Sequence, residues 1–149
     1  MIGSPEVKCG LCDATKGNIV FSSQKWRVVM VEDKHYPGFC RVIWNEHISE
    51  MTDLSDQDRN LIMQVVWKVE QVIRDIMGSH KINLASLGNM VPHVHWHIIP
   101  RYTDDPHFPN PIWSPLDIEE SDVTEKLKLL PRLKLELETR LRNFDQSHS

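Results

Sequence analysis

One short run of alternating residues constrains the fold of this chain more than any other feature. His93, His95 and His97 are separated by single apolar residues, so that the run reads H-V-H-W-H-I-I. Alternation with a period of two predicts a β-strand, because successive side chains point to opposite faces of a sheet. Pro92 before the run and Pro100 after it are typical of strand boundaries, since proline has no amide for a sheet ladder. We therefore expect a strand with three imidazoles on one face. The opposite, apolar face would carry Val94, Trp96 and Ile98.

The spacing of these histidines limits how they can share a ligand. Residues two apart on a strand are separated by about 6.6 Å, so the backbones of His93 and His97 are about 13 Å apart. A zinc–nitrogen bond is about 2 Å long, and an imidazole reaches roughly 6 Å from its backbone. One metal ion could bind neighbouring histidines but hardly both outer ones. We therefore expect the three side chains to have different roles.

The run resembles the signature of the histidine triad (HIT) family of nucleotide hydrolases and transferases, in which three histidines alternate with apolar residues. A second stretch over residues 37–48, P-G-F-C-R-V-I-W-N-E-H-I, is similar to the family pattern P-G-H-x-L-V-I-P-x-x-H-I. It departs from that pattern at Phe39, where many members have histidine, and at Trp44, where they have proline. The resemblance implies an α+β, HIT-like fold with an antiparallel β-sheet, usually in a homodimer.

Composition and charge argue against several other classes of protein. Charged residues make up 26% and hydrophobic residues 40% of the 149 residues, an ordinary balance for one folded domain. The net charge of −4 argues against binding of duplex nucleic acid, which normally requires a basic surface. No apolar run approaches the roughly 18 residues that span a membrane. Because the N-terminal M-I-G-S-P-E-V-K also lacks the apolar core of a signal peptide, we expect a cytoplasmic protein.

The cysteines indicate a metal site. Cys9 and Cys12 form a C-x-x-C motif, which is typical either of half a zinc site or of a redox pair. The redox interpretation favours a motif that opens a helix after a strand, and nothing strand-like precedes this one. In zinc-carrying relatives of the HIT family such a pair is joined by two histidines, which implies that His47 and His93 complete a structural zinc site here. Cys40 lies in an apolar context and is predicted to be a buried small hydrophobic residue.

Periodicity and turn residues predict the other elements. Strands are expected at 18–21, 26–31, 39–44 and 81–85. The clearest helix, about 55–77, has Ser55 as its N-cap, Gly78 as its terminator and apolar residues at steps of three and four. Trp67 within this helix could stack on a base, but a packing role is the stronger prediction.

The chain after Arg101 lies beyond the resemblance. Four prolines between residues 106 and 115 forbid a regular helix and indicate an ordered surface loop. His107, Phe108 and Trp113 in this loop could line the substrate cleft, or they could wrap the core.

The last part of the chain is predicted to be helical. Residues 121–144 have helical spacing, with Pro131 as a break or a second helix start. A stripe of leucines would pack on the domain or on a twin subunit. We therefore expect a HIT domain over 1–112 and a C-terminal helical extension over 113–149.

The resemblance implies a division of roles within the triad. His95 would attack the α-phosphorus of a nucleotide derivative and form a nucleotidyl-histidine, since an imidazole with an ordinary pKa near 6.5 is largely uncharged at neutral pH. The backbone carbonyl of His93 would fix the tautomer of His95, and His97 would contact the scissile phosphate or the leaving group. Water would then release a nucleoside monophosphate. Substrates in the family include diadenosine polyphosphates and nucleoside phosphoramidates.

Several polar residues are candidates for binding the substrate. Gly88 suits a close backbone approach, and the amides of its loop could donate to phosphate. Asn89 could add a side-chain contact or simply form a turn. Glu32 or Asp33 could bond the ribose or be solvated turn acids, and Asn83 could be a site residue or an ordinary polar strand residue.

Three other functions compete with hydrolysis. A nucleotidyltransferase would use a phosphorylated acceptor instead of water, but the family's uridylyltransferase branch lacks a histidine at the third triad position, which His97 occupies here. A non-catalytic nucleotide-binding adaptor is favoured by Phe39 and Met90, which stand where relatives have polar site residues. A zinc metallohydrolase is disfavoured, because a site with four protein ligands would be closed.

Overall fold

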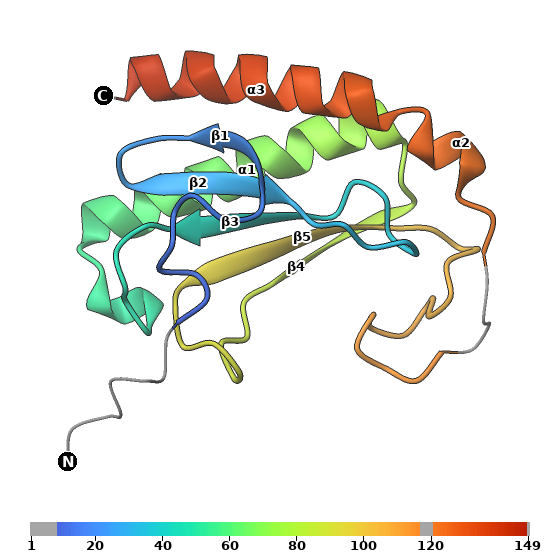
Figure 1. Ribbon diagram of the computed structural model, residues 1–149, viewed down its shortest axis with the longest axis horizontal. Coiled ribbons are helices and arrows are strands. Elements are labelled where there is room, and N and C mark those ends of the chain that lie inside the picture. Colours follow the sequence, from blue (N-terminus) through green and yellow to red (C-terminus); the bar gives the residue numbers. More distant parts are fainter. Residues whose placement is uncertain (1–8, 117–120, 149) are drawn as a thin grey trace.

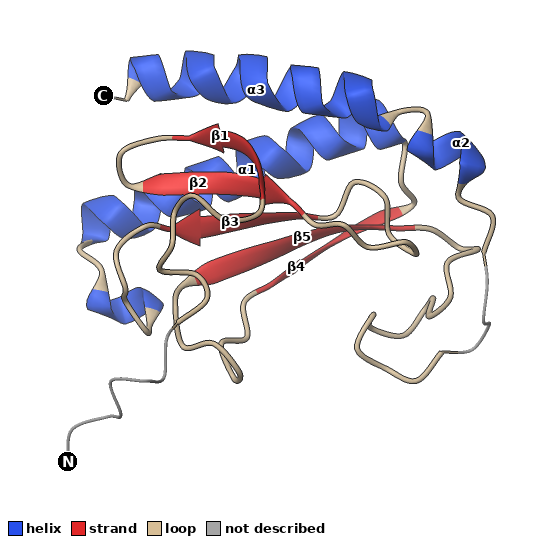
Figure 2. Ribbon diagram, viewed as in Figure 1, coloured by secondary structure: helices blue, strands red, loops and turns tan. Residues whose placement is uncertain are grey.

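The chain forms a five-stranded antiparallel sheet with its long helices on one face (Figures 1 and 2). This computed structural model describes residues 9–116 and 121–148. The strands are β1 (Asn18–Ser22), β2 (Trp26–Met30), β3 (Cys40–Trp44), β4 (Lys81–Ala85) and β5 (His95–Arg101), in the spatial order β1-β2-β3-β5-β4. The helices are a 3-10 helix at Met51–Asp53, α1 (Asp56–Met77), α2 (Thr124–Leu127) and α3 (Leu130–Ser147). The predicted α+β class with an antiparallel sheet is confirmed.

Helix α1 begins and ends where its capping residues predict. The hydroxyl of Ser55 accepts a hydrogen bond of 3.1 Å from the amide of Asp58, and Gly78 closes the helix with a φ of 61°. Glycine adopts this left-handed conformation without the penalty that a Cβ atom brings. Trp67 is 55% exposed, so the prediction that it packs is wrong. It follows the buried Val66 and lies about 100° further around the helix, outside the core stripe.

The predicted apolar face of the histidine strand is buried. Val94, Trp96 and Ile98 lie in or against the hydrophobic core that α1 covers. Alternation along β5 then places His95 and His97 on the other face of the sheet, which the long helices leave open (Figure 1). The functional side chains are therefore carried by a strand whose reverse side is fixed by core packing.

The limits of β5 differ from the prediction at both ends. The strand runs from His95 to Arg101, so His93 lies before it and Pro100 lies inside it rather than after it. The expected strand face therefore carries two of the three imidazoles, while that of His93 faces the cysteines. Strand β3 pairs with β5 only as far as Ile98, whereas Pro100 pairs with Ile82 of β4. Pro100 therefore lies where β5 has lost one of its two neighbours, a place in a sheet where a residue without an amide is tolerated.

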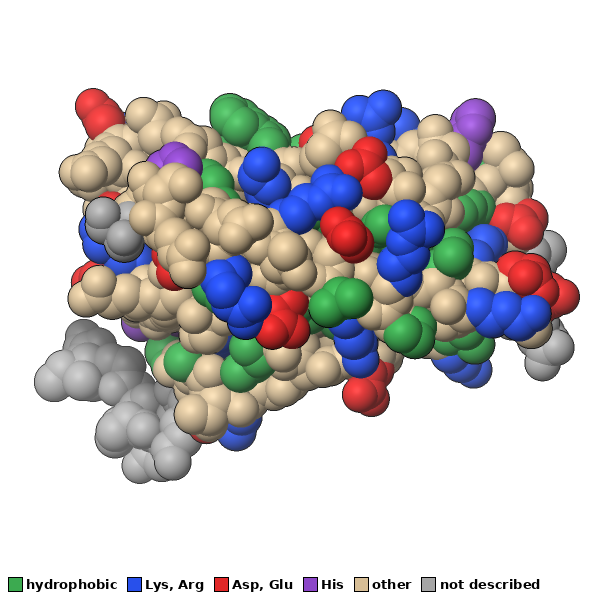
Figure 3. Space-filling view, turned by 90° about the horizontal axis from the view of Figure 1, so that it is seen from above, with side chains coloured by type: hydrophobic (Ala, Val, Ile, Leu, Met, Phe, Trp, Pro, Cys, Tyr) green, Lys and Arg blue, Asp and Glu red, His purple; other side chains and the backbone are tan. Residues whose placement is uncertain are grey.

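The C-terminal helices complete the core. Helix α3 begins at Leu130, with Pro131 in its first turn, where the missing amide needs no partner. The leucine stripe of α3 is fully buried in the same core as α1. Of the two predicted packing partners, the stripe therefore packs on its own domain. The stripe consists of Leu133, Leu137 and Leu141. Acidic and basic side chains are interspersed over the outer surface of the helical layer (Figure 3). Arg140 of α3 forms an ion pair with Asp75 of α1.

Some predictions concern residues outside the described part of the chain. None of the helices in residues 9–116 and 121–148 has both the length and the hydropathy to cross a bilayer. The N-terminal segment that lacks a signal-peptide pattern, residues 1–8, lies outside the described residues, as do residues 117–120 of the C-terminal extension. The homodimer and the cytoplasmic location stay predictions.

Candidate functional site

His95 is held in a single tautomer by the backbone. Its Nδ1–H donates a hydrogen bond of 2.6 Å to the carbonyl oxygen of His93. A carbonyl can only accept, so Nδ1 carries the proton and Nε2 keeps its lone pair. The hydroxyl of Ser86 donates to the carbonyl of His95 at 2.8 Å, which ties the start of β5 to the loop after β4. The free Nε2 of His95 can therefore act as a nucleophile.

His97 lies beside His95 among aromatic rings. The two imidazole centroids are 4.9 Å apart, with their planes at 77°. The rings of Phe39 and Trp113 approach His97 to centroid distances of 5.7 and 5.2 Å. Nδ1 of His97 is buried and has no hydrogen-bond partner within residues 9–116 and 121–148. Since buried polar atoms are normally paired, this nitrogen has a hydrogen-bonding capacity that the described residues leave unused.

Burial and a neighbouring cation keep both imidazoles uncharged. Burial lowers the pKa of His95, the bond to the carbonyl of His93 opposes that shift, and the charge of Arg41 adds to it. For His97, burial, His95 and Arg41 together lower the pKa to about 4. Near pH 7 both rings are therefore neutral, so they can attack or form hydrogen bonds but bring no positive charge.

Arg41 is a residue of this site that no sequence motif indicated. It is the cross-strand partner of His97, and its Nε is buried without a partner in the described part of the chain. Together with Glu32 and Lys134 it lines a hollow of about 670 Å³. Alternation in F-C-R-V-I does place a cation on the face of Phe39. The pairing with His97, however, depends on the register of β3 and β5, which the sequence does not specify.

The two acidic candidates for substrate binding have different surroundings. Glu32 lines the same hollow as Arg41. Asp33 instead caps a turn, because its carboxylate accepts a hydrogen bond of 2.9 Å from the amide of His35. Of the two, Glu32 is therefore the one whose surroundings include a hollow.

The loop before the triad is open to solvent. Gly88 has a φ of 74°, a conformation that side chains with a Cβ atom rarely adopt. Asn89 is exposed, and Met90 is 95% exposed, so neither side chain is fixed by packing. The loop therefore holds neither side chain in a fixed position, and the role of its backbone amides stays a prediction.

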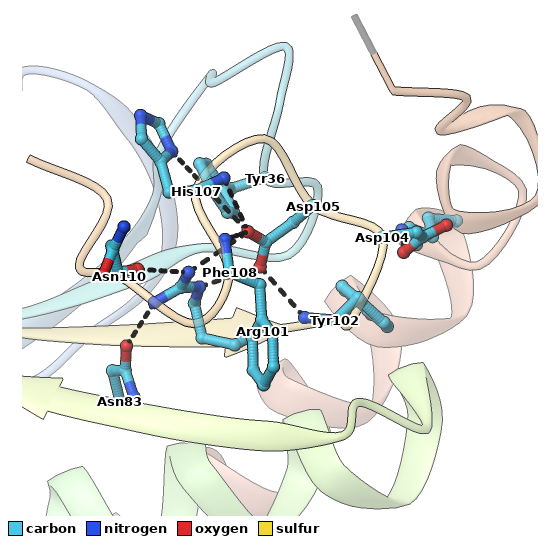
Figure 4. A network of polar contacts seen from close by, with 10 residues as sticks. Tyr36, Asn83, Arg101, Tyr102, Asp104, Asp105, His107, Phe108 and Asn110 are labelled. Atoms are coloured by element: carbon cyan, nitrogen blue, oxygen red, sulfur yellow. Dashed lines mark hydrogen bonds and ion pairs between the residues drawn. The ribbon is translucent and has the colours of Figure 1, made fainter. Parts of the chain in front are cut away.

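A buried ion pair fastens the loop that follows β5 (Figure 4). Arg101 donates from Nε and Nη2 to the two carboxylate oxygens of Asp105 at 2.8 and 3.1 Å, and both residues are almost fully buried. Nη1 of Arg101 donates to the side-chain oxygen of Asn83 at 2.7 Å, so this substrate-binding candidate belongs to the network. Asp105 also accepts hydrogen bonds from the amides of Tyr102, His107 and Phe108.

The three aromatic residues of the proline-rich loop, which could line the substrate cleft or wrap the core, differ in their contacts with this network. His107 is buried against Tyr36, with the hydroxyl oxygen 2.5 Å from Nδ1 of the imidazole (Figure 4). Phe108 lies under the guanidinium of the same ion pair. These two residues wrap the core, whereas Trp113 reaches His97 on the open face. A place in the substrate cleft therefore stays a prediction for Trp113 alone.

The four predicted metal ligands converge at one end of the sheet. The sulfurs of Cys9 and Cys12 and ring nitrogens of His47 and His93 all lie within 4.8 Å of one another. The two Nδ1 atoms are 3.3 Å apart, and three sulfur–nitrogen separations are 3.3, 3.4 and 3.7 Å. A tetrahedral zinc ion with bonds of about 2.0 Å to nitrogen and about 2.3 Å to sulfur has ligand separations of about 3.3 to 3.8 Å. Four of the six separations match these values, so the donor set suits zinc in type and in spacing.

Neighbouring groups orient these ligands. Nε2–H of His93 donates to the carbonyl of Trp44 at 2.5 Å, so its Nδ1 is unprotonated and faces the cluster. Arg27 is almost fully buried and donates to the carbonyl of Leu11, between the two cysteines, at 2.6 Å and to Asn45 at 2.9 Å. The C-x-x-C turn is therefore tied to β2 by protein contacts alone.

Metal removal is expected to expose two thiols and leave the third protected. As zinc ligands, Cys9 and Cys12 should react with a disulfide reagent only after chelation. Burial raises the pKa of the Cys40 thiol to about 12, so this residue should react only in denaturant. Metal analysis should find one zinc ion per chain, lost in Cys12→Ser and kept in Cys40→Ala. Rapid reaction of two thiols in zinc-loaded protein before chelation would contradict the site.

Comparison with known proteins shows to which family the chain belongs. The sequence model described as HIT domain matches residues 14–104, which is more than half of the chain. The chain therefore belongs to the HIT domain family. Among solved structures, a histidine triad protein from Bradyrhizobium japonicum is 26% identical and superposes with a TM-score of 0.67, over 80% of this chain and 91% of its own. The predicted HIT-like fold is thus confirmed.

Two curated relatives are similar to parts of the chain. AP-4-A phosphorylase of Mycobacterium tuberculosis is 28% identical over 78 residues, which are 48% of this chain and 40% of that protein. The asymmetrical bis(5'-nucleosyl)-tetraphosphatase of Schizosaccharomyces pombe is 30% identical over 113 residues, which are 72% of this chain and 62% of that protein. The chain thus spans about half the length of these relatives.

Proposed function

We propose that this protein is a nucleotide hydrolase that acts at the α-phosphate of nucleotide conjugates, of the dinucleoside polyphosphate or nucleoside phosphoramidate type. The observation that carries the proposal is the free Nε2 of His95, which the 2.6 Å bond from Nδ1 to the carbonyl of His93 leaves unprotonated. Beside it lies His97, with an unpaired nitrogen, and the cross-strand partner of His97, Arg41, lines a hollow. The names of the two curated relatives, a phosphorylase and a tetraphosphatase, support this substrate class.

The reaction consists of two displacements at phosphorus. Nε2 of His95 attacks the α-phosphorus, the new P–N bond forms, and the bond to the leaving group breaks, so that the leaving group departs with the electron pair. Water then attacks the same phosphorus and gives up a proton, which balances the proton that the leaving group takes up. The P–N bond breaks, and a nucleoside monophosphate and the free imidazole result. Two easier steps thereby replace one difficult displacement. Hydrogen bonding by His97 would stabilise oxygen atoms of the phosphate or of the leaving group.

Positive charge at the phosphate has to come from outside the triad. The lowered pKa values of His95 and His97 leave both rings neutral near pH 7. Phosphoryl transfer depends mostly on positioning and on neutralisation of negative charge. Arg41 meets that requirement, because it is the cross-strand partner of His97 and has a buried, unpaired Nε. We assign it the electrostatic support that a histidine at the position of Phe39 gives in relatives.

We infer that the zinc site is structural. Cys9, Cys12, His47 and His93 would hold the ion with four protein ligands, which leaves no position for a reacting water molecule. Bound there, zinc supplies a cross-link between the N-terminal turn, the segment after β3 and the start of β5. His95 and His97 carry out the displacement without it.

A product analysis with and without inorganic phosphate tests the proposal. Purified protein is incubated with diadenosine tetraphosphate and, separately, with adenosine phosphoramidate, and nucleotides are separated by chromatography. We expect AMP from at least one compound, independent of phosphate. Phosphate-dependent ADP would instead identify phosphate as the acceptor and a transferase. No turnover of either compound, with AMP still bound, would replace the hydrolase by a nucleotide-binding adaptor.

A further inference from the structure

Two of the four predicted metal ligands lie on segments that core packing does not fix. Cys12 and His47 are both exposed. Apart from the contacts among the four ligands themselves, a single hydrogen bond joins residues 9–12 to the sheet in the part of the chain that the structure describes. Its donor is Arg27 of β2, and its acceptor is the carbonyl of Leu11. The placement of the C-x-x-C turn therefore depends on one arginine.

Arg27 reaches the metal site from the open face of the sheet. Its neighbours along β2, Trp26 and Val28, belong to the core, so alternation places Arg27 on the opposite face. There it pairs across the strands with Ile43, which in turn pairs with His95. The side chain of Arg27 is only 1% exposed. A guanidinium buried to this degree loses its hydration, and hydrogen bonds at defined positions have to offset that loss.

The guanidinium of Arg27 bridges two segments that carry metal ligands. Its Nη2 donates at 2.6 Å to the carbonyl of Leu11, which lies between the two cysteines in the sequence. Its Nη1 donates at 2.9 Å to the side-chain oxygen of Asn45, which comes shortly before His47. Asn45 is itself held in place, because its side-chain amide donates to two carbonyls of the turn between β1 and β2 at 3.1 Å. The rigid fork of one arginine therefore sets how far the C-x-x-C turn lies from the segment of His47.

We propose that Arg27 is a positioning residue of the zinc site, which holds the C-x-x-C turn and the segment of His47 at the separation that one metal ion requires. This inference rests on the structural zinc site inferred above and adds a determinant of its affinity. Both acceptors of Arg27 are oxygen atoms outside the ligand set, so Arg27 acts on the metal through the placement of the ligands. When ligands are already held together, less conformational entropy is lost as the ion binds. Replacing a residue that orients metal ligands typically lowers metal affinity by about 10- to 100-fold.

The test measures zinc affinity by titrating the zinc-loaded protein with a chromophoric chelator. Wild type is compared with Arg27→Lys and Arg27→Met, and circular dichroism confirms that each protein is folded. Lysine keeps the positive charge but lacks the fork that reaches both acceptors, and methionine fills the space without burying an unpaired charge. We expect both variants to bind zinc about 10- to 100-fold more weakly than wild type. Because all four ligands are retained, the visible spectrum of the cobalt(II)-loaded variants should still show tetrahedral coordination, reached at a higher cobalt concentration.

Asp105→Ala provides a matched control for the loss of contacts to a buried arginine. It deprives Arg101 of its partner at the end of β5, whereas His93 and the cysteines lie at the start of that strand. Asp105→Ala should therefore reduce stability and leave zinc affinity unchanged. An equal loss of zinc affinity in Asp105→Ala and the Arg27 variants would show a general effect of destabilisation, which overturns the proposal.

The two Arg27 variants separate the bridge from the charge. Zinc affinity at the wild-type level in Arg27→Lys would show that the charge suffices, and this result also overturns the proposal. If Arg27→Lys does not fold, Arg27→Met decides, and unchanged affinity in that variant contradicts the bridge in the same way. A wild-type protein that binds no zinc refutes the zinc site together with this proposal. That outcome is independent of the hydrolase function, which the release of AMP tests separately.

Discussion

Replacing His95 with alanine should reduce the release of nucleoside monophosphate by at least about a thousandfold. Without the imidazole no covalent intermediate forms, and water would have to attack the α-phosphorus directly. Binding of AMP should change far less, because Glu32, Arg41 and the hollow that they line are untouched. Initial rates with diadenosine tetraphosphate and calorimetric titration with AMP measure the two effects separately.

The control for this substitution is another histidine of the same chain. His148 is exposed at the end of α3, so His148→Ala should keep full activity. His95→Gln, which keeps a hydrogen-bonding side chain of similar reach, should be as inactive as His95→Ala, because an amide is no nucleophile. Activity of both His95 variants at the wild-type level would place the nucleophile elsewhere.

Replacing Asp105 with alanine should lower the free energy of unfolding by about 3 to 5 kcal/mol, because it leaves a buried arginine without its partner. Arg101 is 2% exposed and loses both of its bonds to the carboxylate, and three backbone amides lose their acceptor. The neighbouring Asp104 offers a matched control. Its side chain is 66% exposed and pairs with Lys126 at 3.1 Å, so Asp104→Ala should cost less than about 1 kcal/mol. Urea denaturation at neutral pH measures both values, and equal effects would contradict the prediction.

The contribution of Asp105 should also depend on pH in a defined direction. Burial opposes ionisation of this carboxyl, but Arg101 and the surrounding amides outweigh it and lower the pKa to about 2. In the unfolded chain the pKa of an aspartate is about 3.9. A pKa that is lowered by folding stabilises the folded state above about pH 4, and this stabilisation is lost as the pH falls toward 2. The difference in unfolding free energy between wild type and Asp105→Ala should therefore be constant from about pH 5 to pH 7 and shrink below pH 4.

Features that depend on a few neighbouring residues could be predicted well. The capping residues Ser55 and Gly78 define α1 because they bond only to their own helix ends. The strand over residues 81–85 and the apolar face of β5 follow from alternation, which a few residues suffice to establish. The convergence of two cysteines and two histidines was implied by the family resemblance, and the four ligand atoms do come together.

Features that depend on pairing between distant segments could not be predicted. The position of Arg41 beside His97 is set by the register of β3 against β5. Pro100 lies inside β5 because β3 ends before it, which is a property of the sheet and not of the strand. Arg101 and Asp105 are four residues apart in a stretch that reads as a polar loop, and only the folded structure buries them together.

His93 serves two neighbours through chemically different parts of one residue. Its ring nitrogen faces the cysteine cluster, while its main-chain oxygen holds Nδ1 of His95. Every amino acid has that main-chain oxygen, whereas few have a side chain that binds zinc. A lineage of such proteins could therefore discard the metal by exchanging residue 93 and keep the tautomer of its nucleophile. Selection on metal binding and selection on catalysis can act separately at this position, although they meet in a single residue.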